Sequence, residues 1–203
     1  MQFISNKEKT VTKIGVLALQ GAFIEHISIL QQLGVAALPI RLPAQFEGLD
    51  GLIIPGGESS TLLKLMHAFD IFNVLQGLVL DGFPVWGTCA GLICMGKTTS
   101  RQDDATLEVM DISIKRNAFG RQIDSFETDL NIPALGDNLF KAIFIRAPSI
   151  VKVGYDVDIL ARLPNGTIAA ARQKNMLVTA FHPELSHDSR FHQYFIREIV
   201  TKK

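Results

Sequence analysis

The sequence lacks the features that would place it in several specialised classes. Its 203 residues include 20 lysines and arginines and 20 aspartates and glutamates, so no overall charge favours nucleic acid or an anionic membrane. No stretch approaches the ~20 apolar residues of a membrane span. Residues 1–12 contain charged side chains and no long apolar run, unlike a signal peptide. These absences predict a cytoplasmic protein.

Cysteine is also scarce, which argues against a disulfide scaffold. The two cysteines, Cys89 and Cys94, are too close in sequence to staple a small secreted domain. Four residues separate them, whereas redox and zinc motifs usually separate a cysteine pair by two. Inside a predicted helix, Cys94 is expected to be structural.

The histidines do not form a metal-binding pattern. His182, His187 and His192 are spaced by five residues, which on a helix turns each by about 140° from the last and keeps them off a common face. His26 and His67 are predicted to lie on helix surfaces. The sequence therefore predicts no metal site.

Length and composition fit one α/β domain. A chain with 47% hydrophobic and 20% charged residues is ordinary for a globular protein, and 203 residues can bury one substantial core. Residues 1–12 are predicted to be a flexible extension and residues 13–203 a single domain, because no internal repeat, low-complexity tract or linker interrupts them.

Strands and helices alternate in the first half of the chain. Short apolar runs indicate buried strands, and apolar residues at helical spacing follow them. This alternation is typical of a parallel sheet covered by helices. The predicted strands are residues 14–19, 36–40, 51–54 and 85–86, and the predicted helices begin near residues 23, 62, 73 and 92.

The second half is richer in half-exposed strands, in which apolar and polar residues tend to alternate. Pro164-Asn165-Gly166 is a strong hairpin signal between two of them. A last helix is predicted to place Phe191, Phe195 and Ile199 on one face. The predicted strands are residues 107–116, 123–130, 140–145, 157–163, 167–171 and 176–181.

Gly87-Thr88-Cys89-Ala90-Gly91 has the form of a nucleophile elbow with cysteine in the place of serine. A nucleophile on a sharp strand-to-helix turn needs small neighbours, and the following helix N-terminus favours a thiolate. The N–H of Ala90 could then face a developing oxyanion. The same residues could also form a glycine-bounded turn around an ordinary buried cysteine.

Two further segments carry candidate site residues. Pro55-Gly56-Gly57-Glu58-Ser59-Ser60 lies between a strand and a helix, where glycines expose N–H groups to an anion; it has no P-loop lysine and is also compatible with a plain turn capped by Ser59 or Ser60. At the last strand, His182 and Glu184 could be a general base and its orienting carboxylate. Alternatively, His182 is a strand-end histidine and Glu184 a first-turn acid.

Two arginines, Arg116 and Arg146, each follow a strand-like run. Arginine suits the carboxylate of an amino-acid substrate, although a surface salt bridge is the other reading of either residue.

In this order, the PGGES turn, the GTCAG elbow and the terminal HPE resemble the class I (triad) glutamine amidotransferases. More narrowly, the chain resembles the glutaminase subunits of pyridoxal 5′-phosphate synthases over about residues 13–200. The segments that carry this narrower resemblance are Leu19-Gln20-Gly21, residues 116–122, residues 124–127 and Ile145-Arg146-Ala147-Pro148.

The resemblance implies a role for each matching residue. Cys89 would be the nucleophile, His182 the general base and acid, and Glu184 its orienting partner. The N–H groups of Gly57 and Ala90 would form the oxyanion hole. The residues implied to bind L-glutamine are Gly56, Gly57, Glu58, Arg116, Ile145 and Arg146.

The resemblance also implies a fold and a partner. The fold would be a three-layer, flavodoxin-like α/β arrangement, with a mixed, mostly parallel sheet between helices and a small antiparallel extension. The partner would be a (β/α)₈-barrel synthase subunit in a large hetero-oligomeric ring, receiving ammonia to make pyridoxal phosphate. No cofactor is implied for glutamine hydrolysis.

Two other functions fit parts of the pattern. A glutaminase subunit of another synthase, such as imidazole glycerol phosphate synthase, would use the same chemistry with a different partner; the segments around Arg116 and Arg146 argue against it. A catalytically silent, cysteine-based sensor is disfavoured because His182 and Glu184 accompany the elbow.

Overall fold

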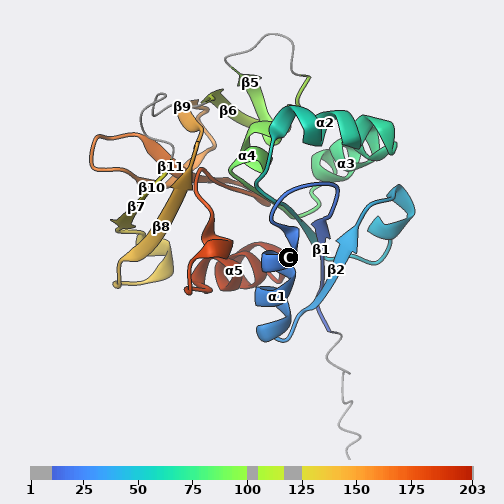
Figure 1. The fold of residues 1–203 in the computed structure, drawn as a ribbon, viewed down its shortest axis with the longest axis horizontal. Helices are drawn as coiled ribbons and strands as arrows, with labels where there is room; N and C mark the ends of the chain where they lie inside the picture. Colours follow the sequence, from blue (N-terminus) through green and yellow to red (C-terminus); the bar gives the residue numbers. More distant parts are fainter. Residues whose placement is uncertain (1–10, 100–104, 117–124, 203) are drawn as a thin grey trace, which may run out of the picture.

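The structure, a computed structural model, describes residues 11–99, 105–116 and 125–202. A ten-stranded mixed sheet and a separate two-stranded antiparallel sheet form its framework. Helices α1 and α5 lie on one side of the large sheet, and α2 and α3 lie on the other (Figure 1). This three-layer arrangement confirms the predicted fold class.

The large sheet runs in the order β2 (Ala36–Ile40), β1 (Lys13–Leu17), β3 (Gly51–Ile54), β4 (Val85–Thr88), β12 (Met176–Thr179), β11 (Ile168–Gln173), β9 (Ser149–Val153), β6 (Met110–Lys115) and β5 (Gly96–Thr99), with β10 (Asp158–Arg162) paired to β11.

The parallel half of the sheet carries the loops that build the site. Strands β2, β1, β3, β4 and β12 are mutually parallel, so the loops that follow them leave at one edge of the sheet. From β11 onward the pairing is mainly antiparallel. The helices are α1 (Phe23–Gln32), α2 (Ser59–Ala68), α3 (Ile71–Leu80), α4 (Ala90–Met95) and α5 (Arg190–Tyr194), the last continued by a π-helical turn, η4 (Phe195–Val200).

The core forms where the apolar runs predicted it. Leu52, Ile53 and Ile54 of β3 are fully buried although successive side chains point to opposite faces, as expected for a strand covered on both faces. On the α5 side, Trp86 packs against Phe191 and Phe195. Each such buried large side chain contributes roughly 1.5–3 kcal/mol through removal of apolar surface from water.

The antiparallel extension is the two-stranded sheet of β7 (Ser125–Leu130) and β8 (Phe140–Ile145). The hairpin predicted at residues 164–166 is confirmed: β10 and β11 are antiparallel and flank it, with Gly166 at φ 85°.

Strands β5 and β9 were not predicted, because Gly96–Thr99 is polar and Ser149–Val153 closely follows another strand-like run. Among the described residues, three of the connections contain a short 3₁₀ turn: η1 (Pro43–Phe46), η2 (Pro133–Leu135) and η3 (Pro183–Leu185).

Two sequence-based predictions about single residues are wrong. Helix α2 is capped by Glu58, whose carboxylate accepts hydrogen bonds from the N–H groups of Ser60 (3.2 Å) and Thr61 (2.7 Å), and not by Ser59 or Ser60. His26 is completely buried and does not lie on the helix surface, because α5 packs against that face of α1. His67, in contrast, is exposed.

Part of the predicted pattern lies outside the described residues. This applies to most of the N-terminal extension, to the start of the strand predicted at residues 123–130, and to residues 117–122 of the family-like segment that begins at Arg116.

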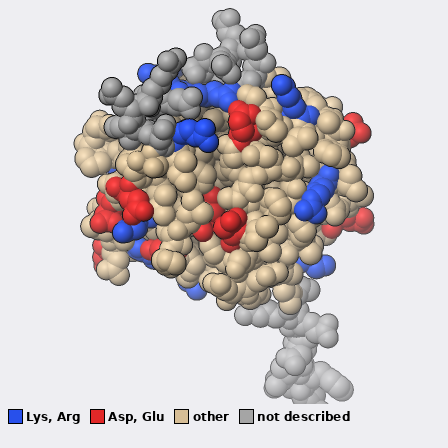
Figure 2. Space-filling view, in the orientation of Figure 1, with Lys and Arg blue, Asp and Glu red and all other residues tan. Residues whose placement is uncertain are grey.

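The surface carries both signs of charge, in agreement with the equal numbers of basic and acidic residues. Basic and acidic side chains are interspersed on the face shown in Figure 2. Within the described ranges, no single helix is long and apolar enough to cross a membrane; α2 and α3 pass such a test only as a pair bent by 100°.

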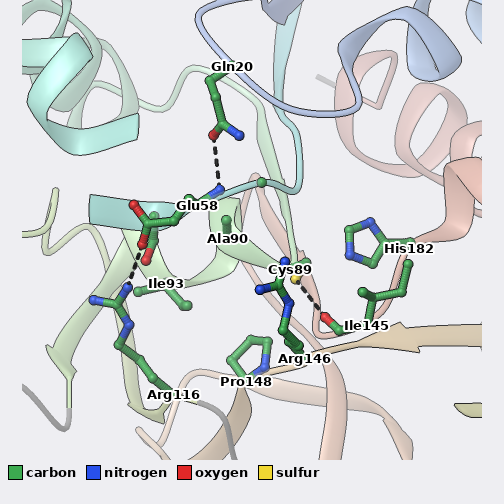
Figure 3. A pocket seen from close by; sticks show the side chains of 12 residues that line it. Gln20, Glu58, Cys89, Ala90, Ile93, Arg116, Ile145, Arg146, Pro148 and His182 are labelled. Carbon is green, nitrogen blue, oxygen red and sulfur yellow. Dashed lines mark hydrogen bonds and ion pairs between the residues drawn. The ribbon is translucent and has the colours of Figure 1, made fainter. Parts of the chain in front are cut away.

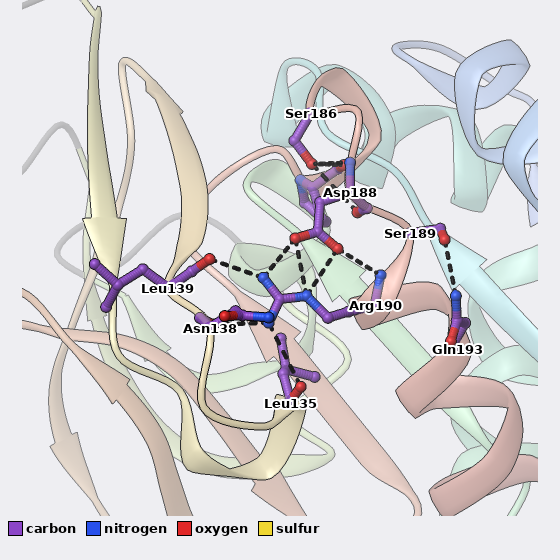
Figure 4. A network of polar contacts seen from close by, with 9 residues as sticks. Leu135, Asn138, Leu139, Ser186, Asp188, Ser189, Arg190 and Gln193 are labelled. Carbon is purple, nitrogen blue, oxygen red and sulfur yellow. Dashed lines mark hydrogen bonds and ion pairs between the residues drawn. The ribbon is translucent and has the colours of Figure 1, made fainter.

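Arg190 ties the β7–β8 connection to α5 (Figure 4). Its guanidinium contacts the carboxylate of Asp188 at 2.6–3.0 Å and donates to the carbonyls of Asn138 (2.7 Å) and Leu139 (2.8 Å). The Asp188 carboxyl is partly buried, which alone would raise its pKa, but hydrogen bonds from Arg190 and its charge lower the pKa. One side chain therefore holds the connection, the turn before α5 and the helix together.

We expect Arg190→Lys to lower the free energy of unfolding by about 2 kcal/mol, since hydrogen bonds to charged groups contribute ~1.5–3 kcal/mol and a single ammonium cannot span these acceptors. The measurement is equilibrium unfolding in urea. Arg162→Lys is the matched control, because Arg162 is exposed and donates to one carbonyl, that of Gly166. Equal losses in both variants would contradict the role of Arg190.

Candidate active site

Cys89 occupies a strained turn between β4 and α4. Its backbone has φ 47° and ψ −99°, a conformation that non-glycine residues rarely adopt and that clusters at functional sites. The flanking glycines are required: a Cβ on Gly87 would lie 2.6 Å from the backbone of Gly91, and one on Gly91 would lie 2.1 Å from the carbonyl oxygen of Ile54. The elbow predicted from Gly87–Gly91 is therefore the structure of this segment, while Cys94 is buried in the core.

The loop after β12 carries His182 and Glu184. Proline 183 begins η3, and the turn brings Nδ1 of His182 to 2.7 Å from Oε1 of Glu184. The N–H of His182 donates to the carbonyl of Ile143 in β8 (2.8 Å), which fixes the loop against the small sheet. Both side chains are buried, so the histidine and the carboxylate are held in one geometry.

The charges of this pair reinforce each other. Burial alone would lower the pKa of His182, but its interactions with Cys89 and Glu184 prevail and raise the pKa to about 10. Burial would raise the pKa of Glu184, yet the neighbouring His26 and His182 bring it well below its usual value. Glu184 is thus ionised and His182 protonated at neutral pH.

The Gly56–Gly57 turn lies against the nucleophile and the histidine. A Cβ on Gly56 would be 2.3 Å from Cε1 of His182 and 3.3 Å from Cβ of Cys89, so only glycine leaves room there. The carbonyl of Gly56 accepts a hydrogen bond from the N–H of Ala22 (3.2 Å). In a trans peptide the N–H of Gly57 consequently points to the side opposite this carbonyl.

Glu58 and Arg116 form a charged pair at the same cavity. Nη2 of Arg116 lies 3.2 Å from Oε1 of Glu58, and the guanidinium also donates to the hydroxyl of Ser60. Burial alone would raise the pKa of Glu58, but hydrogen bonds from Thr61 and Ser60 and the charge of Arg116 lower it. In these positions the carboxylate can bind the α-ammonium group of a free amino acid, and the guanidinium can bind its α-carboxylate.

These groups meet around one cavity of about 600 Å³, a size typical of small-ligand sites. Figure 3 shows Cys89 between His182 on one side and the Glu58–Arg116 pair on the other. Glu184 is not in the lining and sits behind His182, and Gly56 lies beside the His182 ring. The predicted site residues in the lining are Gly57, Glu58, Cys89, Ala90, Arg116, Ile145, Arg146 and His182.

The lining also includes residues for which the sequence predicted no role. Gln20 lies in the loop that follows β1, and its Oε1 accepts a hydrogen bond from the N–H of Glu58 (2.9 Å). Its position after a parallel strand is the signal that could have revealed it. The other three are Ser59, Ile93 and Pro148. Among the described residues, no group of three or more histidine, cysteine or acidic side chains is arranged to hold a metal ion.

Fold and site together define a class: an α/β enzyme in which a cysteine on a strand-to-helix elbow faces a histidine held by a buried glutamate. The family model described as the SNO glutamine amidotransferase family matches residues 16–201. The chain belongs to this family.

The relatives agree over nearly the whole chain. A protein from Dehalococcoides mccartyi named pyridoxal 5′-phosphate synthase subunit PdxT is 54% identical over 187 residues, covering 91% of this chain and 96% of its own. One of the same name from Herpetosiphon aurantiacus is 54% identical over 186 residues, with 90% and 98% covered.

Solved structures show the same likeness. A crystal structure of a glutamine amidotransferase superposes with a TM-score of 0.87 at 42% identity, covering 92% of this chain and 98% of that one. The structure of PurLQS from Thermotoga maritima gives a TM-score of 0.68 at 15% identity, covering 93% of this chain and 98% of that one, and indicates the fold alone.

Proposed function

We propose that this chain is the glutaminase subunit of a pyridoxal 5′-phosphate synthase, hydrolysing L-glutamine to L-glutamate and ammonia. The observation that carries the proposal is the meeting of the Cys89–His182–Glu184 set with the Glu58–Arg116 pair at one cavity. The names of the relatives supply the synthase, and none of the relatives reported above belongs to imidazole glycerol phosphate synthase.

In the first half of the reaction, the Cys89 thiolate attacks the side-chain amide carbon of glutamine and forms a C–S bond. His182 gives its proton to the amide nitrogen, and the C–N bond breaks to release ammonia and leave a thioester. In the second half, His182 takes a proton from water as the water oxygen attacks the thioester carbon. The C–S bond then breaks, yielding glutamate and the thiolate.

The developing negative charge on the amide oxygen needs donors that are already in place. We assign this role to the N–H groups of Gly57 and Ala90, the residues that follow the close-packed Gly56 and the nucleophile. Preorganised donors of this kind contribute roughly 3–4 kcal/mol each to the transition state.

Substrate recognition follows from the charges at the far side of the cavity. Glu58 would accept hydrogen bonds from the α-ammonium group of glutamine, and Arg116 and Arg146 would bind the α-carboxylate. Gly56, Gly57 and Ile145 would contribute backbone contacts beside the reacting amide. Arg146 is held at φ 42°, a strained conformation of the kind found at ligand-binding positions.

The product dictates the partner's role. Ammonia in water at neutral pH is mostly protonated and no longer a nucleophile, so a docked (β/α)₈-barrel synthase subunit must receive it directly, in a ring in which each barrel carries one glutaminase. Glutamine hydrolysis itself uses only the side chains named above. The two cysteines are free and buried, which suits the reducing cytoplasm.

The test is glutamine turnover by the isolated chain and by its complex with the barrel subunit. We expect weak or absent hydrolysis by the free chain and activation of at least about tenfold by the partner, which corresponds to ~1.4 kcal/mol in the activation barrier. In this structure the N–H of Ala22 holds the carbonyl of Gly56, the orientation that leaves the N–H of Gly57 for the oxyanion. We expect docking to favour this orientation over the flipped peptide, which glycine allows at little steric cost.

Gly57→Val should abolish the activation, because a β-branched residue lacks the backbone freedom of glycine and its Cβ would lie 2.5 Å from Oε1 of Gln20, which accepts the N–H of Glu58. Gly77→Ala, at a helical position with open space around it, is the control and should be activated like the wild type. Equal turnover by the free chain and the complex would contradict the proposal.

A further inference from the structure

Two buried histidines lie behind the proposed catalytic set and take no part in the mechanism above. His26 comes from α1 and His192 from α5, helices that lie on the same side of the sheet (Figure 1). Both side chains are 0% exposed. Burying an imidazole without hydrogen-bonding partners is costly, so a pair of them at this depth needs an explanation.

The two histidines extend the line of side chains that begins at Cys89. Nε2 of His26 lies 3.3 Å from Oε2 of Glu184, the carboxylate oxygen that His182 does not contact. On its other side, Nδ1 of His26 lies 2.9 Å from Nε2 of His192. The carboxylate of Glu184 is therefore flanked by two imidazoles, one for each oxygen.

His26 is the group placed to satisfy Oε2 of Glu184. That oxygen is buried and has no well-aligned hydrogen-bond donor among the described residues. The hydroxyl of Thr88 lies 3.5 Å from Nε2 of His26 and competes weakly for the same N–H. A carboxylate held at one oxygen only can rotate, and rotation would take Oε1 away from Nδ1 of His182.

His192 sets the tautomer of His26. Burial lowers the pKa of His192 well below its usual value, so His192 is neutral. If its proton is on Nε2, it donates to Nδ1 of His26, and the proton of His26 is left on Nε2, facing Glu184. The opposite tautomer would put the proton of His26 on Nδ1 and turn the lone pair of Nε2 toward the ionised Glu184, whereas Nδ1 of His192 is buried without a described partner in either tautomer.

Aromatic rings hold both imidazoles in place. Trp86 packs edge-on against His26, with ring centroids 5.6 Å apart, and against His192 at 4.9 Å. Phe191 stacks on the same indole ring. The imidazoles consequently have little freedom to turn, and the contacts that join Glu184, His26 and His192 are held in place before the substrate binds.

We infer that His26 is a positioning residue for the glutaminase reaction proposed above: its Nε2–H holds the second oxygen of Glu184, and His192 fixes the tautomer of His26. The substrate touches neither histidine. The inference rests on the proposed function, and its consequence is that packing between α1 and α5 controls the orientation of His182.

The test compares two amide substitutions of the same residue in the complex with the barrel subunit. In His26→Gln the amide nitrogen can take the place of Nε2 and still reach Glu184. In His26→Asn the amide reaches only the place of Nδ1, toward His192. We expect His26→Gln to keep kcat within about threefold and His26→Asn to lose roughly 10- to 100-fold, the range known for outer-shell partners of metal-bound histidines.

The KM for glutamine should stay within about twofold in both variants, because His26 lies outside the cavity lining and acts after binding. His67→Asn, at an exposed position on α2, is the control for a histidine-to-amide change. Equal kcat values for the two His26 variants, each corrected for its folded fraction from thermal unfolding, would overturn the inference. Failure of the wild-type complex to hydrolyse glutamine would instead refute the proposed function.

His192 is tested through a double-mutant cycle. We expect His192→Leu to lower kcat by about threefold in the wild type and to have no further effect in the His26→Asn variant. Independent, multiplicative losses would show that His192 does not act through His26.

Discussion

Replacing Cys89 with alanine or serine should abolish glutamine hydrolysis while the chain remains folded and binds its partner. The expected loss in kcat is at least about 10⁴-fold, since removing the nucleophile of a comparable triad costs on the order of 10⁶-fold. Serine does not rescue the reaction, because its hydroxyl is not ionised by a neighbouring imidazolium as a thiol is. The measurement is glutamate release by the complex, with partner binding checked by size-exclusion chromatography.

Cys94 provides the matched control for this prediction. It is the other cysteine, five residues further on, fully buried inside α4. Cys94→Ala should retain nearly full kcat in the folded fraction, and a glutamine-derived electrophile should label Cys89 and spare Cys94. Hydrolysis by a Cys89→Ala protein whose Cys94 alone is labelled would refute the assignment.

The second large effect concerns His182 and Glu184. His182→Asn should lose at least about 10³-fold in kcat, because both the proton delivered to the leaving nitrogen and the proton taken from water pass through the imidazole. Glu184→Gln should lose less, roughly 10²-fold, since its amide oxygen can still accept from Nδ1 of His182. A Glu184→Gln variant with full activity would reduce Glu184 to a structural acid.

The same pair predicts how stability depends on pH. The pKa of His182 is raised in the folded protein from 6.5 to about 10, so its charged contacts contribute fully below about pH 6.5 and are lost as the pH rises toward 10. The wild type should therefore lose stability relative to His182→Asn between pH 6.5 and 10. Urea unfolding of both proteins across this range measures the difference, and a constant difference would contradict the raised pKa.

Sequence alone predicted much of the site because its parts are short and local. The elbow at Cys89 needs small neighbours, and the spacing of His182 and Glu184 lets one turn bring them together. Both features can therefore be recognised as short sequence motifs. The sequence around Gln20 and Ser59 gives a weaker indication of their place in the cavity, because that place depends on how loops from different strands converge.

The errors have the same physical origin. His26 was predicted to be exposed because helical periodicity says which residues share a face, but not which second element will cover it; α5, from the far end of the chain, does so. The cap of α2 was expected at Ser59 or Ser60, but the longer carboxylate side chain of Glu58, the residue before them, reaches the first N–H groups of the helix. Strand β5 was missed because Gly96–Thr99 is polar and gains its order from pairing with β6.

The amide nitrogen of glutamine can be followed into pyridoxal phosphate to test the proposed glutaminase function. The wild-type complex would be supplied with amide-¹⁵N glutamine, the synthase's sugar phosphates and unlabelled ammonium, and the pyridoxal phosphate formed would be analysed by mass spectrometry. We predict ¹⁵N in the product made by the wild type, and only unlabelled product made by the complex that contains the Cys89→Ala chain. Equal ¹⁵N incorporation by the two complexes, or none by the wild type, would refute the proposed function of this chain.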